Sequence, residues 1–124
     1  MPKHPRIEIV LDEPPSVNRI WRQGRGRTYK DAKASAYCLK VSRLWRTQLG
    51  KTDVLFPAGV AVRYTFKWYR SRKAGDLSNR VKVVEDALNG IVWDDDKQVV
   101  ECHLYRYDAP KGKGRVELLI EAAE

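Results

Sequence analysis

Hydrophobic and polar residues alternate in four stretches of the chain, and apolar residues recur at helical spacing in two others. The alternating stretches predict β-strands at residues 6–11, 59–68, 98–107 and 115–121. The helical spacing predicts amphipathic helices at residues 31–50 and 78–89. Elements in this order indicate a small α+β fold, in which two helices pack against a four-stranded, mostly antiparallel or mixed sheet.

Proline and glycine residues mark the connections between these elements. The two prolines at residues 14–15 end the first strand, because proline has no amide hydrogen for a central strand. The Gly-Arg-Gly-Arg run at residues 24–27 predicts the tip of a hairpin, and we expect residues 19–30 to form a basic, mobile arm. The glycines within residues 110–114 predict that the last two strands form a hairpin with a basic turn.

The length of 124 residues suits one modest core, so we expect a single domain over residues 1–124 with a flexible tail at residues 1–5. No apolar run approaches the roughly 20 residues needed to cross a bilayer, and the N-terminus lacks the apolar stretch of a signal peptide. Cys38 and Cys102 are far apart and outside any metal-type spacing, which indicates reduced thiols. These features predict a cytoplasmic protein.

Positive charge dominates the first part of the chain. The protein carries 24 Lys and Arg against 16 Asp and Glu, and residues 1–50 hold 11 of these bases but only four of the acids. Trp21 and Tyr29 are interleaved with the bases of the arm, a composition typical of surfaces that bind phosphates and stack on nucleic-acid bases. The alternative is a solvated loop that is basic only for solubility.

Acidic residues concentrate in two places on this basic chain. Asp76 precedes the second helix, and three consecutive aspartates at residues 94–96 follow it, where a cation would relieve their mutual repulsion. Such oxygen ligands suit Mg²⁺, and Lys82 between them is a point charge for a phosphate. A joint site requires the turn to fold back toward Asp76. The alternative is a solvated turn, with Lys82 paired to Asp86 on the helix surface.

Five short motifs occur in a fixed order along the chain. They are Pro14-Pro15-Ser16-Val17-Asn18-Arg19, Gly26-Arg27-Thr28, Asp76-Leu77-Ser78-Asn79 with Lys82, Asp86-Ala87-Leu88, and Asp95-Asp96-Lys97-Gln98-Val99. From about residue 9 to about residue 121 this set resembles the RusA family of Holliday-junction resolvases, small phage-associated endodeoxyribonucleases. The resemblance implies a homodimeric, Mg²⁺-dependent nuclease of DNA recombination and repair. It implies paired symmetric nicks in four-way DNA junctions, with no small-molecule cofactor beyond the metal.

The resemblance also implies roles for individual residues. Asp76 and Asp96 correspond to metal-binding aspartates and Lys82 to the catalytic lysine, so we expect these three to be catalytic, with Asp95 as a weaker metal ligand beside Asp96. We expect recognition of the junction to depend mainly on its backbone and shape. The expected DNA-binding residues are Asn18, Arg19, Arg22, Arg25, Arg27, Lys30, Arg70, Arg72, Lys73, Lys111 and Lys113.

Ser78 departs from the family pattern, which has a third aspartate at this position. A hydroxyl brings no charge to a metal, so Asp94, Glu85 or Asp86 would have to compensate. A catalytically weak or inactive protein that still binds junction DNA is therefore the alternative. A small RNA-binding domain would also suit the size and charge, but it leaves the acidic residues unexplained.

Overall fold

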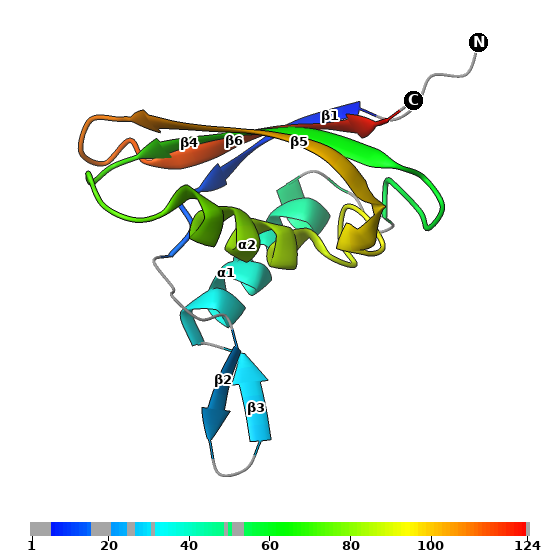
Figure 1. The fold of residues 1–124 in the computed structure, drawn as a ribbon, viewed down its shortest axis with the longest axis horizontal. Coiled ribbons are helices and arrows are strands. Elements are labelled where there is room, and N and C mark those ends of the chain that lie inside the picture. Colours follow the sequence, from blue (N-terminus) through cyan, green and yellow to red (C-terminus); the bar gives the residue numbers. More distant parts are fainter. Residues whose placement is uncertain are drawn as a thin grey trace.

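The computed structural model describes residues 6–15, 21–24, 27–30, 32–48, 50 and 54–123. Within these residues the fold has six strands and two α-helices (Figure 1). In chain order the elements are β1 (Arg6–Asp12), β2 (Trp21–Gly24), β3 (Arg27–Lys30), α1 (Ala32–Arg43), the π-helical turn η1 (Leu44–Gln48), β4 (Val62–Arg70), α2 (Leu77–Leu88), the 3-10 turn η2 (Asp96–Gln98), β5 (Val99–Asp108) and β6 (Arg115–Ala122). Within the described residues, no helix is long and apolar enough to cross a bilayer.

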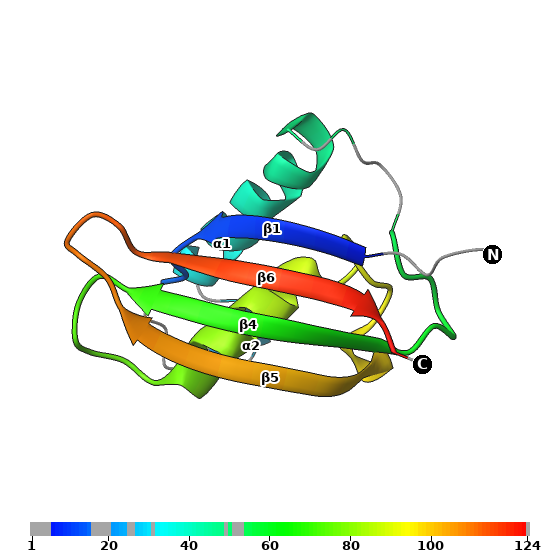
Figure 2. The ribbon, with the colours of Figure 1, turned by 90° about the horizontal axis from the view of Figure 1, so that it is seen from above.

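Four strands form one mixed sheet in the order β1-β6-β4-β5 (Figure 2). β6 is antiparallel to both β1 and β4, whereas β4 and β5 are parallel and are joined through α2. Together with the two helices, this sheet confirms the predicted α+β class. The shorter β2 and β3 pair with each other, as the hairpin prediction required.

The predicted hairpin between the last two strands is wrong, because β4 lies between β5 and β6. The burial of the strands gives the physical reason. Every second residue of β6 is buried, from Val116 to Ala122, and a strand of this kind gains most from a neighbour on each side. β5 is exposed along nearly its whole length and occupies the edge.

Both helices lie against the same face of the sheet, and the opposite face is open (Figures 1 and 2). The core between these layers is aromatic on the sheet side, with Tyr64, Phe66 and Trp68 of β4 almost fully buried. α2 contributes the buried Val83 and Val84 from its opposing face. The alternation of β4 therefore decides which side chains meet the helices and which meet solvent.

Candidate active site

Asp76 lies at the N-terminus of α2, where the loop from β4 turns into the helix. Its backbone is extended and its carbonyl accepts the first helical hydrogen bond, from the Arg80 amide at 3.3 Å. The Asp76 side chain makes no capping hydrogen bond and is exposed. Its carboxylate thus stands beside the positive end of the helix with its oxygens available to an external ligand.

Gly75 and Arg80 fix the approach of this loop to the helix. Gly75 has a φ of +100°, a conformation that L-residues with a side chain rarely adopt. A Cβ at Gly75 would lie 2.8 Å from Arg80 Nη2 and 3.3 Å from Trp68 Cη2. Arg80 itself is only 8% exposed, and its guanidinium carbon lies 4.6 Å from the centre of the Trp68 ring. The loop therefore passes directly over a buried arginine.

Glu13 connects the end of β1 to the same loop. Its carboxylate accepts hydrogen bonds from Trp68 Nε1 at 2.9 Å and from Ser71 Oγ at 2.6 Å, and Arg80 donates to the carbonyl of Pro14. Partial burial alone would raise the pKa of Glu13, but the hydrogen bonds and the charge of Arg80 outweigh it and hold that pKa below its usual value. The network ties the residues before Asp76 to the sheet.

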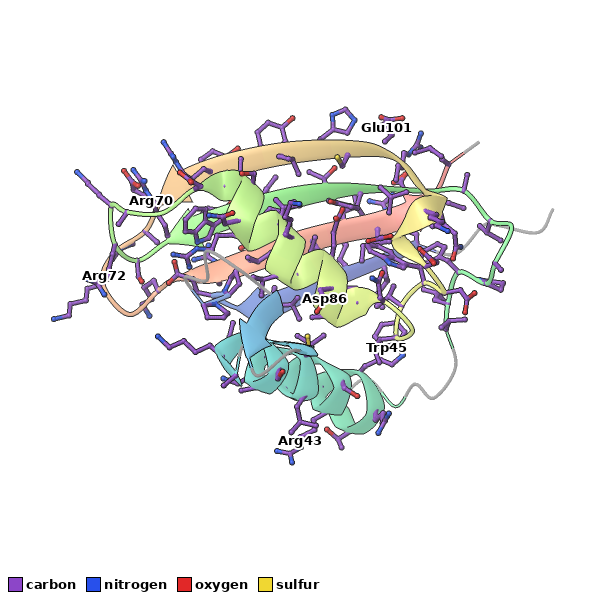
Figure 3. All side chains as sticks on the ribbon, turned by 60° about the horizontal axis from the view of Figure 1, so that its bottom comes forward. Arg43, Trp45, Arg70, Arg72, Asp86 and Glu101 are labelled. Atoms are coloured by element: carbon purple, nitrogen blue, oxygen red, sulfur yellow. The ribbon has the colours of Figure 1, made fainter. Side chains whose placement is uncertain are left out.

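Ser78 and Lys82 lie on consecutive turns of α2, and both are exposed. Among the described residues Lys82 forms no ion pair, so the surface pair between Lys82 and Asp86 is not formed. Asp86 instead accepts a hydrogen bond from Cys38 Sγ at 3.6 Å and lies between α2 and α1 (Figure 3). The lysine is available to an anion next to the first turn of the helix.

The acidic turn at residues 94–96 is held by its own hydrogen bonds. Asp95 caps η2 and accepts from the Lys97 amide at 2.9 Å, and this bond lowers the pKa of Asp95. Gln98 Oε1 accepts from the amides of Asp94 at 3.0 Å and Asp95 at 2.9 Å. One Asp95 oxygen is thus engaged in the capping box.

Gln98 also anchors this turn to the segment before β4. Its Nε2 donates to the carbonyls of Phe56, Pro57 and Val60 at 3.1, 2.8 and 2.9 Å. These contacts place the acidic turn near the start of β4, whereas Asp76 follows the end of β4.

Asp76 and the acidic turn therefore lie at opposite ends of α2 (Figures 1 and 2). The helix has 12 residues and is about 18 Å long. The turn stays at its C-terminal end because the Val92 amide donates to the Leu88 carbonyl at 3.0 Å and Trp93 Nε1 donates to Asn89 Oδ1 at 2.6 Å. The expected fold-back toward Asp76 does not occur within one chain. In the described part of the chain, no three His, Cys, Asp or Glu residues form a group that could hold a metal ion.

The residues considered as substitutes for the missing aspartate do not reach Asp76 either. Glu85 accepts a hydrogen bond from the buried Tyr64 hydroxyl, and Asp86 contacts Cys38. Both lie in the second half of α2, and Asp94 belongs to the distant turn. Within a single protomer, Ser78 is left without a nearby carboxylate from this set.

Four exposed bases gather at the end of the sheet from which Asp76 leaves. Arg72 and Lys73 belong to the loop between β4 and α2, and Lys111 and Lys113 to the turn between β5 and β6 (Figure 2). Arg70 lies at the same end but is ion-paired with Asp108 at 2.5 Å (Figure 3). Five of the expected DNA-binding residues thus lie at the Asp76 end of the molecule.

The remaining expected DNA contacts lie in the basic arm or, for Asn18, directly before it. Arg22, Arg27 and Lys30 are on the β2–β3 hairpin, which projects away from the sheet below α1 (Figure 1). Asn18, Arg19 and Arg25 lie outside the described residues, as does the tail at residues 1–5.

Two structural features were missed by the reading of the sequence. The capping box of Asp95 and Gln98 has the D-x-x-Q spacing that marks a helical N-terminus, so it was detectable in the sequence. Arg80 lies on the face of α2 that carries the buried Val83, Val84 and Ala87, so its position on the helix indicated burial. Its partners Glu13, just after β1, and Trp68, in β4, are distant in the sequence and gave no local signal.

Comparison with known proteins gives a family match and several similar relatives. Residues 12–121 match the family described as Endodeoxyribonuclease RusA. The crossover junction endodeoxyribonuclease RusA of Escherichia coli strain K12 is 34% identical over 113 residues, which cover 90% of this chain and 91% of the relative. The crossover junction endodeoxyribonuclease of Enterobacteria phage 82 and that of Shigella sonnei strain Ss046 have the same identity and coverage.

Proposed function

Because this chain belongs to the RusA family of endodeoxyribonucleases, we propose that it resolves four-way DNA junctions by paired nicks that require Mg²⁺. The observation that carries the proposal is the uncapped, exposed carboxylate of Asp76, which precedes the helix that carries the exposed Lys82 and lies at the end of the sheet where the bases gather. The proposed setting is the cytoplasm of a bacterium or of a phage-infected host, in DNA recombination and repair.

We infer that the working unit is a homodimer in which each active site is shared. The two acidic groups lie at opposite ends of a helix, so one protomer cannot bring both to one phosphate. Two α2 helices running antiparallel across a two-fold axis would place Asp76 of one protomer next to the acidic turn of the other, and would do so twice. Two such sites match the two opposed strands that must be cut in a four-way junction.

In this arrangement Asp76 of one protomer and Asp96 of the other would hold the Mg²⁺, with Asp95 as an auxiliary ligand. The ion supplies a polarised water and neutralises charge on the phosphate when it is bound. Lys82 stabilises the negative charge that develops on the phosphate oxygens. The hydroxyl of Ser78 can donate a hydrogen bond to a bound phosphate oxygen, but it adds no negative charge to the site.

The bases at the Asp76 end bind the phosphate backbone and orient the junction. Arg72 and Lys73 are exposed on the loop that carries Asp76, and Lys111 and Lys113 are exposed on the turn between β5 and β6. Arg70 is partly neutralised by Asp108 and contributes less. Contacts of this kind position the protein without reading sequence.

The shared site can be tested by mixing two inactive variants, Asp76→Asn and Asp96→Asn. Each variant alone is expected to bind a synthetic four-way junction and fail to cut it. In the mixed dimer, one site receives both substitutions and the other receives none, so nicking of one strand returns. With sites contained in single protomers, both would stay damaged and the mixture would remain inactive. Omission of Mg²⁺, with EDTA present, is the control for the metal.

A junction-binding protein with little or no nuclease activity is the second candidate, and the neutral Ser78 favours it. The Ser78→Asp variant separates the two. If the natural chain binds junctions without cutting and Ser78→Asp cuts them, the missing carboxylate limits the activity. If the natural chain already cuts efficiently, the second candidate is excluded.

A further inference from the structure

We propose that the open face of the sheet carries a second DNA-binding site, which stacks the bases of an unpaired strand on three tyrosines. Tyr69 of β4 and Tyr105 and Tyr107 of β5 form this site, named here the tyrosine face. The alternating burial of β4 and its register with β5 place these tyrosines on the side of the sheet opposite the buried Tyr64, Phe66 and Trp68. This side of the sheet carries no helix (Figure 2). The inference goes beyond junction cleavage, because it concerns bases rather than the phosphate to be cut.

The three tyrosine rings stack against one another in a row across β4 and β5. Tyr69 and Tyr107 are paired across the parallel strands, with ring centroids 5.1 Å apart and planes inclined by 26°. Tyr105 and Tyr107 alternate along β5, and their centroids are 6.3 Å apart with planes inclined by only 10°. The rings are therefore ordered relative to one another, and a base can continue the row at its Tyr105 end or insert between rings.

Arg115 of β6 extends this surface and is itself held in place. Its guanidinium carbon lies 4.0 Å from the centre of the Tyr69 ring. Arg115 Nε donates to Glu117 at 2.8 Å, and Nη1 donates to the Lys113 carbonyl at 3.0 Å. A guanidinium plane fixed in this way adds a fourth stacking group next to the tyrosines.

The exposure of the tyrosines exceeds what the fold requires. Tyr105 and Tyr107 are 44% and 42% exposed, on an edge strand that buries little else. Cross-strand aromatic pairs stabilise a sheet, which accounts for the pairing of Tyr69 with Tyr107. The ring of Tyr105, opposite Lys67 in the register, gains no aromatic partner on β4 and is placed to meet a ligand.

The charge around the tyrosine face favours nucleic acid as the occupant. Lys67 lies opposite Tyr105 on β4, and Lys111 and Lys113 belong to the turn that leads from β5 to β6. The nearby acids are already paired, Glu117 with Arg115 and Asp108 with Arg70. Aromatic rings edged by bases are the arrangement that binds single strands by stacking and phosphate attraction together.

The test compares two single-stranded DNA oligonucleotides of eight nucleotides each. One consists of thymidines, and the other has the same sugar-phosphate backbone but no bases. Fluorescence anisotropy measures the affinity of the natural protein for each. We expect tighter binding of the oligonucleotide that carries bases. Tyr105→Leu and Tyr107→Leu should each weaken binding of that oligonucleotide by about tenfold, or ~1.4 kcal/mol, within the range for one stacked base. Binding of the abasic oligonucleotide should not change.

Tyr105→Phe and Tyr107→Phe are the matched controls, because they keep the ring and remove only the hydroxyl; binding should persist. Equal affinity of the natural protein for the two oligonucleotides would overturn the proposal without any variant. Unchanged affinity in both leucine variants would also overturn it. So would dissociation of a dimer by the leucine substitutions in sedimentation experiments, because the tyrosine face would then join two copies of the chain. None of these measurements uses a four-way junction, so they are independent of the proposed nuclease function.

Discussion

The hydrogen bonds of Gln98 make this residue the anchor of the acidic turn, and we predict that Gln98→Ala destabilises the protein. The side chain contacts three carbonyls and two amides at 2.8–3.1 Å. An amide group has only two N–H donors, so these contacts amount to about four hydrogen bonds. At roughly 0.5–1 kcal/mol each they stabilise by about 2–4 kcal/mol. Because Gln98 is half-buried, water replaces some of them, and we expect a net loss of about 2 kcal/mol.

Thermal unfolding at fixed protein concentration measures this loss, which corresponds to a midpoint lower by about 6–10 °C for a domain of this size. Gln98→Glu is the matched control, because it separates the hydrogen bonds that Gln98 accepts from those that it donates. Its carboxylate can accept from the two amides but cannot donate to the carbonyls at neutral pH. We therefore expect Gln98→Glu to be destabilised at pH 7 and to regain part of the loss at a pH below about 4.3, where the acid is protonated. A loss smaller than about 0.5 kcal/mol in Gln98→Ala would refute the reasoning, because the observed bonds would then contribute almost nothing.

Three further predictions follow from the network near Asp76 and from the bases around it. Gly75→Ala should destabilise by about 1–3 kcal/mol in urea unfolding, because its φ is positive and the new Cβ would meet Arg80; a neutral result would contradict the geometry. Hydrogen bonds and the charge of Arg80 hold the folded-state pKa of Glu13 below its ordinary value of 4.5, so the stabilisation by Glu13 is present above that value and is lost as the pH falls through the folded pKa. Glu13→Gln should therefore make the free energy of unfolding less dependent on pH in the acid range. If the free energy of unfolding falls with acid as steeply as in the natural protein, Glu13 does not stabilise the fold through its charge. Lys111→Ala and Lys113→Ala should each reduce the slope of log affinity for junction DNA against log salt by about 1, provided that each lysine contacts one phosphate. A slope equal to that of the natural protein would remove that lysine from the DNA interface.

Local periodicity was sufficient to predict most of the elements, because it depends only on the direction of successive side chains. The alternation of Tyr64, Phe66 and Trp68 predicted a strand, and these three residues are buried on one face of β4. The valines of α2 predicted a helix over residues 78–89, and the helix spans Leu77–Leu88. The helix predicted for residues 31–50 is divided in two: its α-helical part is α1 (Ala32–Arg43), and the chain continues as the π-helical turn η1 (Leu44–Gln48).

What the sequence alone determined about this protein is the set of elements, the two acidic groups, the basic character and the ordered motifs that identify its family. Only the tertiary structure decided that β6 lies between β1 and β4, and that Asp76 and the acidic turn lie at the two ends of α2. Only the tertiary structure also brought Glu13, Trp68 and Arg80 together, and aligned the rings of the tyrosine face. The physical reason is that side-chain periodicity is a property of neighbouring residues. Strand order and distant contacts depend instead on which surfaces bury the most apolar area together, and that is a property of the whole chain.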